Sequence, residues 1–468
     1  MPFAIPAPTL RAQPVSVTRQ MAAALARLEA EARAKGQVLH HLGAGYPHPE
    51  VSDPSLWIAQ KRGYFQHVAE VQEGAPERRL PRLMSALYNY TDTLGPPSAR
   101  AAFARVYGHD FGFYVDSDAC VPTIGATGGI SMMCALYEHA GEPIAYLVDA
   151  PTYTGFLSRA QLYHKASFYS VPLDGQGPDP ALMAQQIDRA RADGKTVAFY
   201  YTVTDGHNPG GISFSLARRQ AILEVCREKG VLVVEDAPYT YISYERPEDR
   251  PAPLVALAPD QVVHLFTASK IGLPGPRVGM AIAAARVALA DGRVLPVRDL
   301  LVSESAGSVL FHNPEALRAF EAYLTDARFA PRDSLWPIAA AKNAVYSENR
   351  RILLAGLTHF LGDRPELFGW TEPGAGFFSV FTFKGGGIRT DTAFIERLIE
   401  EHGVVVIPMF GFYSADARAR DPGVGLDQIR LSFCYSPSIG AARVREITAA
   451  VEAFGRAVRS LCGLPRVD

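Results

Sequence analysis

The chain has 468 residues, of which 48% are hydrophobic and 20% are charged, and its formal net charge at pH 7 is −2. These values are typical of a globular protein with one large domain and a smaller one, and they exclude the strongly basic surface of a nucleic-acid-binding protein. We therefore expect small-molecule substrates and further copies of the chain as partners, with no nucleic acid and no membrane among them.

Five cysteines are scattered along the chain without CxxC spacing. This pattern predicts free thiols in a reducing compartment, not a disulfide framework or a zinc site, so we expect no metal. The N-terminus lacks the basic and apolar regions of a signal peptide. No apolar run approaches the roughly 20 residues that a membrane-spanning helix needs. We expect a cytoplasmic protein.

The first predicted element is an amphipathic helix over residues 16–34, in an N-terminal arm. Residues 95–282 then alternate helical patterns with short β-branched or aromatic-rich runs. These runs cover residues 144–148, 197–203, 231–234 and 262–266. Apolar strands separated by helices predict a mostly parallel sheet with helices on both faces.

The last third of the chain has a different pattern. Residues 313–361 are mostly helical, and shorter strand-like and helical segments follow them. The segments are strand-like at 376–383, 404–407 and 429–434 and helical at 391–402. This mixture predicts a smaller α+β domain. We expect an arm and part of the small domain at 1–60, a large domain at 61–314 and a small domain at 315–468, joined by the long helical region.

Two glycine-rich turns carry the first chemical signals. Residues 122–129 read PTIGATGG and open a helical stretch, so their backbone N–H groups could bind a phosphate. Residues 205–211 read DGHNPGG, a polar turn whose Asn208 could donate to a phenolate oxygen. Each turn alone is equally compatible with a purely structural role.

A carboxylate and a phenol follow a β-branched run at residues 233–239, which read VVEDAPY. Asp236 and Tyr239 are three positions apart, so both can face one cleft. A carboxylate there can keep a pyridine nitrogen protonated, and a phenol can bind the oxygen of the same ring. A helix-capping aspartate followed by a packed tyrosine would also explain the pattern.

The most informative segment is residues 266–279, FTASKIGLPGPRVG. Lys270 directly follows a predicted buried strand, and strand ends line the clefts of open α/β sheets. In a cleft, burial and nearby cations lower the pKa of an amine and make it a nucleophile. Thr267, Ser269 and Arg277 surround it with groups suited to an anion. A solvated loop lysine is the alternative.

In this order and spacing, the motifs resemble the class I/II aminotransferase family, whose enzymes use pyridoxal 5′-phosphate (PLP) on fold type I. The resemblance runs from about residue 40 to about residue 455. It rests on the motifs above and on four further segments, which are residues 43–47 (GAGYP), Tyr90-x4-Gly95-x4-Arg100, residues 151–153 (PTY) and residues 429–433 (IRLSF). The run 269–279 most resembles the valine–pyruvate aminotransferase branch.

The resemblance implies a large domain with a mostly parallel sheet and a smaller α+β domain. It implies that Lys270 forms a Schiff base with PLP and, once free, moves a proton. Asp236 would keep the ring nitrogen protonated and Tyr239 would bind the ring oxygen. The remaining cofactor-binding residues would be Ala126, Thr127, Tyr153, Asn208, Thr267, Ser269, Arg277 and, toward the neighbouring subunit of a homodimer, Tyr90. Arg430, with Gly45 and Asn208, would bind the substrate, because a guanidinium fork suits a carboxylate.

The sequence departs from the family pattern at one turn, where Gly210 stands in the third position of Asn-Pro-Thr-Gly. His207, just before it, is interpreted as a turn residue, with a second acid or base as the alternative. The regions 303–312 and 413–427 resist alignment.

We expect an aminotransferase of amino-acid metabolism. The alternative on the same fold is a PLP enzyme of elimination, replacement or cyclisation. A transcription regulator of this fold is disfavoured, because only about 40 residues precede the resemblance, without a basic recognition helix. No second arginine is evident in the pocket-lining segments, and residues 377–378 and 410–413 are aromatic-rich, which suits an apolar substrate side chain.

Overall fold

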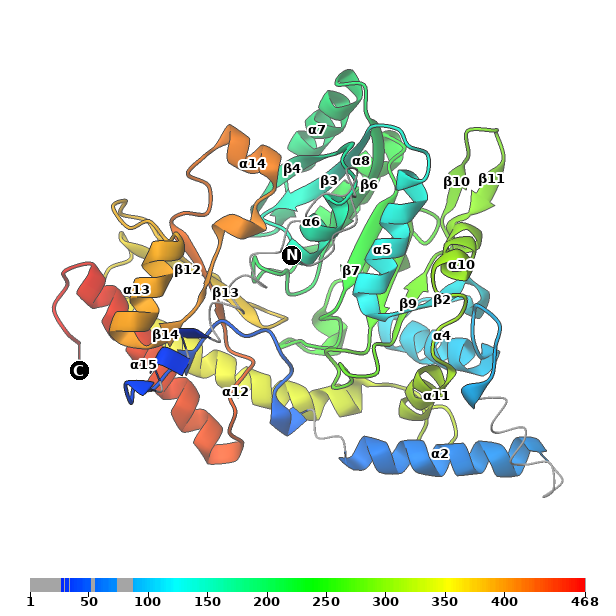
Figure 1. Ribbon diagram of the computed structural model, residues 1–468, viewed down its shortest axis with the longest axis horizontal. Helices are drawn as coiled ribbons and strands as arrows, with labels where there is room; N and C mark the ends of the chain where they lie inside the picture. The colour runs from blue at the N-terminus through cyan, green and yellow to red at the C-terminus, as the bar shows by residue number, and fades with distance from the viewer. Residues whose placement is uncertain (1–26, 29, 33, 52–54, 74–86, 468) are drawn as a thin grey trace, which may run out of the picture.

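The computed structural model describes residues 27–28, 30–32, 34–51, 55–73 and 87–467. The helix predicted over residues 16–34 lies largely outside these ranges, and the described residues between 27 and 34 are helical. The chain forms two lobes of unequal size, with the larger sheet in one lobe and the C-terminal helices in the other (Figure 1).

The larger lobe is built on an eight-stranded sheet with the order β2-β9-β8-β7-β6-β3-β4-β5. The five central strands β8, β7, β6, β3 and β4 run parallel to one another, and the outer pairs are antiparallel. The predicted mostly parallel sheet is therefore confirmed. Its strands are β2 (Cys120–Thr123), β3 (Ile144–Ala150), β4 (Ala166–Asp174), β5 (Gly177–Pro178), β6 (Thr196–Thr202), β7 (Val233–Ala237), β8 (Val262–Thr267) and β9 (Gly279–Ile282).

Helices cover both faces of this sheet, as predicted. On one face, α5 (Gly125–Glu138), α6 (Thr154–Ala160) and α10 (Val297–Ser308) share a buried core with Tyr146, Val148 and Tyr201 of the sheet. On the other face, α4 (Pro97–Phe111), α7 (Pro180–Ala192), α8 (Leu216–Glu228), α9 (Leu254–Leu257) and α11 (Pro314–Tyr323) share a core with Leu147 and Tyr200. Alternate residues of one strand thus enter opposite cores, as the two-residue period of a strand requires.

The smaller lobe has a four-stranded antiparallel sheet with the order β12-β13-β16-β15. Its core is formed with the long C-terminal helix and with α13, whose first turn is capped by the Asp391 side chain. The elements are β12 (Phe368–Trp370), β13 (Phe378–Phe383), α13 (Thr392–His402), β15 (Ile407–Pro408), α14 (Ala415–Arg420), β16 (Gln428–Ser432) and α15 (Gly440–Leu461). The predicted strands and helix of this region are confirmed within a few residues.

An N-terminal segment joins the smaller lobe through a short parallel pair. β1 (His40–His41) pairs with β14 (Val404–Val405), which places residues 43–46 beside β15 and β16. The helix α2 (Ser55–Glu73) instead packs against α11 of the larger lobe (Figure 1). The remaining elements are η1 (Pro49–Val51), η2 (Ser117–Ala119), η3 (Pro247–Asp249), β10 (Arg286–Ala288), β11 (Val294–Pro296) and η4 (Phe410–Phe412).

A single long helix, α12 (Trp336–Leu361), runs from one lobe to the other (Figure 1). Its first turns contribute Ala339 to the core of the larger lobe, and Ile352 and Leu357 belong to the core of the smaller lobe. The sequence predicted one mostly helical region here, and the structure divides it into α11 and α12. None of the described helices is long and apolar enough to span a bilayer.

The parallel strands β6, β7 and β8 end at the same edge of the large sheet. The last residues of these strands and those just after them line one cavity, at positions 203, 208, 236, 238, 239, 267, 269 and 270. Parallel strands deliver their carboxyl ends to one edge, and ligands of open α/β sheets bind there.

Candidate active site

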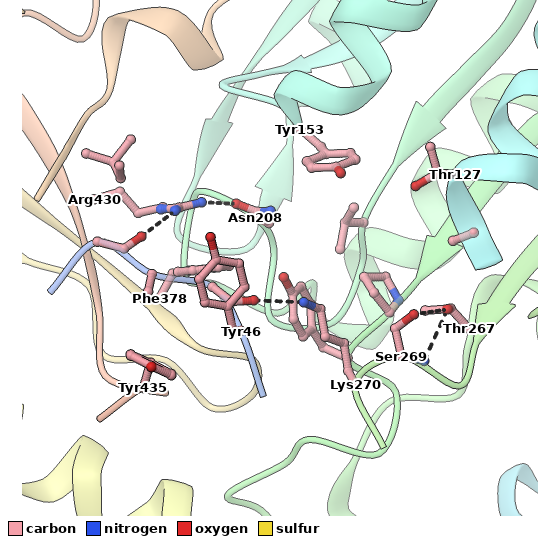
Figure 2. A pocket seen from close by; sticks show the side chains of 18 of the residues that line it. Tyr46, Thr127, Tyr153, Asn208, Thr267, Ser269, Lys270, Phe378, Arg430 and Tyr435 are labelled. Atoms are coloured by element: carbon pink, nitrogen blue, oxygen red, sulfur yellow. Dashed lines mark hydrogen bonds between the residues drawn. The ribbon is translucent and has the colours of Figure 1, made fainter. Parts of the chain in front are cut away.

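A cavity of about 770 Å³ lies between the strand ends of the larger lobe and the strands of the smaller lobe. Every predicted site residue except Tyr90 lines it (Figure 2). Thr127, Thr267 and Ser269 lie on one side of the cavity, Arg430 and Asn208 lie on the other, and Lys270 lies between them (Figure 2). The structure thus brings together predicted site residues from seven segments of the sequence.

Lys270 follows β8 by three residues and reaches into the middle of the cavity. Its Nζ donates to the backbone oxygen of Gly45 at 2.8 Å and lies 5.8 Å from the ring centre of Phe377. Burial lowers the pKa of Lys270, and the positive charges of Arg430 and Arg277 lower it further. A lowered pKa increases the neutral fraction of the amine, which is the nucleophilic form.

Asp236 is buried at the end of β7 with one oxygen engaged and one oxygen free. Its Oδ2 accepts a hydrogen bond from the Tyr201 hydroxyl at 2.7 Å, whereas Oδ1 has no hydrogen-bond partner among the residues that the structure describes. Burial raises the pKa of Asp236 to about 6. An orphaned carboxylate oxygen in a buried site is costly unless a donor is supplied from outside the chain, and a protonated ring nitrogen is such a donor.

A group of hydroxyl, guanidinium and backbone donors forms an anion site beside Lys270. Arg277 donates to the Ser269 hydroxyl at 2.9 Å, and the Thr267 hydroxyl donates to the same oxygen at 3.0 Å. Gly125 begins α5 with a φ of +63°, and a Cβ there would lie 2.7 Å from an Arg277 nitrogen. Glycine suits both this positive φ and the close approach of Arg277 to the backbone. The first N–H groups of α5 then face the site and are suited to bind a phosphate.

Arg430 lies buried at the opposite side of the cavity, on β16. Its guanidinium donates to Asn208 Oδ1 at 2.9 Å and to the backbone oxygen of Gly43 at 3.0 Å. The rings of Phe378 and Phe412 lie 4.1 and 5.1 Å from its central carbon. Burial lowers the pKa of Arg430 to about 10. No carboxylate of the described part of the chain pairs with Arg430, so this buried guanidinium between aromatic rings is suited to a carboxylate from solution.

The contact with Arg430 also fixes how Asn208 is oriented. A guanidinium can only donate hydrogen bonds, so the Asn208 atom facing it is the amide oxygen. The amide nitrogen of Asn208 remains as a donor toward the cavity.

The unusual turn around Asn208 has a structural explanation. The buried His207 ring accepts a hydrogen bond from the Gly210 N–H through Nδ1 and lies 3.2 Å from an Asp149 oxygen through Nε2. A Cβ on residue 210 would lie 2.8 Å from His207 Nδ1, so glycine replaces the family threonine there. His207 does not line the cavity. These contacts support its interpretation as a turn residue.

Tyr90 is the predicted site residue that the structure leaves apart. It is 79% exposed and contacts the edge of Phe311. Its predicted role toward a neighbouring subunit stays a prediction.

The wall of the cavity beyond Arg430 was not predicted from the sequence. This wall contains His41, Ala44, Tyr46, Phe378, Val405, Ile407, Tyr435 and Pro437. Tyr46 and Tyr435 meet edge to face, with ring centres 5.9 Å apart. Phe378 belongs to the aromatic-rich segment noted above, and Tyr46 follows Gly45 in the quoted turn. Ala44 lies in the same turn. His41, Val405 and Ile407 lie on strands of two residues, and Tyr435 and Pro437 lie in the loop after β16, and none of these five belongs to a motif.

These residues fit PLP. The cavity offers a half-buried amine of lowered pKa, an orphaned carboxylate oxygen and an anion site within one space, and the ring of Tyr153 lies beside them (Figure 2). The described residues contain no cluster of histidine, cysteine, aspartate or glutamate suited to a metal ion. The fold and site define a PLP-dependent enzyme of fold type I.

Comparisons with known proteins give the class. Residues 65–420 match the family of class I and II aminotransferases. The chain is 29% identical over 397 residues to the (S)-3,5-dihydroxyphenylglycine transaminase of Amycolatopsis orientalis, covering 84% of this chain and 82% of that protein. The structure superposes on an archaeal alanine:glyoxylate aminotransferase with a TM-score of 0.75, at 24% identity and 96% coverage of both chains. It also superposes on the Pyrococcus horikoshii kynurenine aminotransferase, solved with the cofactor form PMP, with a TM-score of 0.73, at 21% identity and coverage of 97% and 96%.

The chain belongs to the class I and II aminotransferase family. It is a PLP-dependent enzyme that transfers an amino group between an α-amino acid and a 2-oxo acid. The family match and the names of the relatives favour transamination over elimination, replacement or cyclisation.

Proposed function

We propose that this aminotransferase takes a neutral α-amino acid with an apolar or aromatic side chain as its amino donor. The observation that carries the proposal is the distribution of charge in the cavity. Lys270 and Arg277 lie in the cofactor half and Arg430 begins the substrate half. The remaining wall, which begins beyond Arg430, has no lysine, arginine, aspartate or glutamate among its described residues, and His41 is its one basic side chain. A second carboxylate on the substrate would therefore be buried without a lysine or arginine partner, which is strongly unfavourable.

The contacts of Asp236 and of the anion site support the assignment of the cofactor half of the cavity to PLP. Bound PLP supplies a ring that withdraws electrons from the bonds at the substrate Cα. Asp236 Oδ1 holds the ring nitrogen, while Tyr239 and the amide nitrogen of Asn208 hold the ring oxygen. Tyr153 covers the ring face. Ala126, Thr127, Thr267, Ser269 and Arg277 hold the phosphate.

The substrate half begins at Arg430, whose fork grips the α-carboxylate between the rings of Phe378 and Phe412. Asn208 holds that fork in place through its side-chain oxygen. Gly45 offers only backbone, so the substrate can approach closely. Lys270 Nζ, at the boundary between the two halves, takes the proton from the substrate Cα and returns it.

The substrate side chain then faces the Tyr46–Tyr435 pair, Val405 and Ile407. Aromatic walls favour an aromatic or aliphatic side chain over a charged one. The relative from Amycolatopsis orientalis is named for a substrate of this kind, an amino acid with a dihydroxyphenyl ring. The resemblance to the valine–pyruvate branch adds valine as a candidate donor.

A homodimer with shared active sites is part of this proposal. Tyr88 and Tyr90 are 63% and 79% exposed, and Leu310 is 50% exposed. Thr93 donates to the Leu310 backbone oxygen at 2.8 Å, so these apolar side chains belong to neighbouring segments. A group of exposed large apolar side chains is suited to a protein interface. Tyr90 would extend from it toward the phosphate of the second subunit.

The domain limits also stay a proposal. The hydrophobic cores change from one lobe to the other within α12, between Ala339 and Ile352. This change of core supports a domain limit within α12, after the limit at 314/315 expected from the sequence. We further propose a cytoplasmic enzyme of amino-acid metabolism or biosynthesis.

A panel of half-reactions tests the substrate class. The PLP-loaded enzyme is mixed with one amino acid at a time and no 2-oxo acid acceptor, and release of the donor's oxo acid is measured. We expect phenylalanine, an arylglycine or valine to react at least about a hundredfold faster, per unit concentration, than aspartate, glutamate or lysine, because burying an unpaired charge costs several kcal/mol. Aspartate or lysine as the fastest donor would contradict the proposal.

A further inference from the structure

Two neighbouring tyrosines of β6 donate hydrogen bonds to two different buried aspartates. The Tyr201 hydroxyl donates to Asp236 at 2.7 Å, and the Tyr200 hydroxyl donates to Asp149 at 2.6 Å. All four side chains are buried. Only one of the two aspartates, Asp236, lines the cavity.

The sheet register explains why each tyrosine meets its own aspartate. Tyr201 pairs with Val234 of β7, and Asp236 lies two residues further on the same face. Tyr200 pairs with Leu147 of β3, and Asp149 lies two residues further on the opposite face. Successive residues of a strand point to opposite faces, so the two hydroxyls act in separate cores.

Tyr201 is held rigidly in its place. Its ring stacks on Phe156 with centres 4.0 Å apart and planes 3° apart. Burial, together with the negative charge of Asp236, raises the pKa of Tyr201 well above its ordinary value, so the hydroxyl keeps its proton and can only donate to the carboxylate. Among the described side chains, no other donor makes a hydrogen bond to Asp236, and its Oδ1 remains free.

We propose that Tyr201 is a positioning residue that commits one oxygen of Asp236, aims the other at the cofactor ring nitrogen and keeps the shared proton on that nitrogen. The inference rests on the proposed role of Asp236. A hydroxyl that donates to a carboxylate stabilises the ionised form over the protonated form. It therefore opposes burial, which raises the pKa of Asp236, and disfavours transfer of the ring proton to Oδ1.

Tyr201→Phe tests the inference, with Tyr200→Phe as the matched control. The two tyrosines lie on the same strand, and each variant removes one buried hydroxyl that donates to one carboxylate. The phenylalanine ring that replaces Tyr201 keeps the stack on Phe156. The enzyme is loaded with PLP carrying ¹⁵N in the ring, and the ¹⁵N chemical shift reports how much of the ring nitrogen is protonated at neutral pH. The kcat and KM values of a half-reaction donor are measured beside it.

We expect Tyr201→Phe to move the resonance toward the unprotonated position and to lower kcat about tenfold or more with little change in KM, since a hydrogen bond to a charged group is being removed. Tyr200→Phe should leave the resonance unchanged. In the Asp236→Asn background, Tyr201→Phe should have no further effect on kcat, because the two changes act through one interaction. Equal resonances and equal kcat values for the two phenylalanine variants would overturn the inference.

Two further outcomes keep the test decisive. If Tyr201→Phe does not fold, 3-fluorotyrosine at position 201 keeps the contacts of the tyrosine and donates a stronger hydrogen bond to Asp236. A shift of the ¹⁵N resonance toward the unprotonated position would then contradict the inference. An unprotonated ring nitrogen in the unmodified enzyme would instead refute the role of Asp236 itself. The failure of that assignment is thus distinguishable from a failure of Tyr201 alone.

Discussion

The two halves of the cavity are built in different ways. The cofactor half comes almost entirely from the strand ends and first helical turn of the larger lobe, where Asp236, Thr267 and Lys270 lie at or just after the ends of neighbouring parallel strands. The substrate half is assembled from residues 41–46, β13, β14, β15 and the end of β16, which belong to the smaller lobe and its N-terminal segment. One half is fixed by a single sheet, and the other depends on how two lobes meet.

Substitutions in the two halves of the cavity should therefore have different effects. Changes in the cofactor half should alter the spectrum and retention of PLP, whatever the substrate. Changes in the substrate half should alter the response to the amino acid and leave the cofactor spectrum intact. Four substitutions test this difference between the two halves, beginning with the one that should reduce activity most.

Lys270→Ala should have the largest effect. Loss of the amine removes both the covalent attachment of PLP and the group that moves the Cα proton, so activity should fall by at least about a thousandfold. The visible band of the lysine-bound cofactor should disappear. Lys342→Met is the matched control, because Lys342 is also half-buried, with its pKa lowered by burial to about 8, but does not line the cavity. A surviving band in Lys270→Ala would place the attachment elsewhere.

Asp236→Asn should stabilise the cofactor-free protein while weakening PLP binding. Burial raises the pKa of Asp236 from 3.8 to about 6 in the folded state. Below pH 4 Asp236 is protonated in both the folded and the unfolded state, so it does not lower the free energy of unfolding. Between pH 4 and pH 6 the unfolded state ionises first, so wild-type stability falls as the pH rises, by an amount on the order of 3 kcal/mol that is complete above pH 6.

The advantage of Asp236→Asn in the free energy of unfolding should therefore grow from pH 4 to pH 6 and then stay constant. Urea unfolding of the two cofactor-free proteins at several pH values measures it. An advantage that is the same at every pH would show that the carboxylate is not strained by burial.

Arg430→Lys should weaken binding of the amino acid without changing the cofactor spectrum. Lysine keeps the charge and loses the two-pronged geometry, and a hydrogen bond between charged groups contributes about 2 kcal/mol, so KM should rise roughly thirtyfold. Arg459→Lys is the control, because Arg459 is equally buried but pairs with Asp363 outside the cavity. It should lower the melting temperature and leave KM unchanged. A changed visible spectrum in Arg430→Lys would break the division between the two halves.

Tyr46→Ala should have the smallest effect and the most selective one. An aromatic pair contributes about 1 kcal/mol, so KM for an aromatic donor should rise about fivefold while KM for alanine changes little. Tyr114→Ala, at a position 86% exposed and outside the cavity, controls for loss of a surface tyrosine. Equal losses for both donors would argue against a role of Tyr46 in recognising the side chain.

The same difference between the halves governs what the sequence could predict. Lys270, Asp236 and the glycine-rich turn before α5 were identified because a strand end followed by a polar or glycine-rich turn is a local pattern. Their neighbours in space are also set by the sheet order. Arg430 was identified through the family resemblance, although its buried setting between two phenylalanines comes from distant segments.

The side-chain wall could not be predicted for a physical reason. His41, Val405 and Ile407 lie on strands of two residues. The pair β1–β14 brings the N-terminal segment against the smaller lobe, and the pair β15–β16 lies within that lobe. Nothing local in a strand of two residues distinguishes a pocket wall from a core. The sequence also did not predict that the helical region is interrupted between α11 and α12. Residues 324–335 contain one proline, Pro331, and apolar residues recur among them as they do in the flanking helices.

The most direct measurement of the central claim is the visible spectrum of the PLP-loaded enzyme before and after one neutral amino acid is added, with no acceptor present. The account predicts that the band of the Lys270-bound cofactor is replaced by that of the amine form of the cofactor, with one molecule of oxo acid released per active site. Release of ammonia or a side-chain fragment with the band retained would contradict transamination, and failure to bind PLP would contradict the site itself.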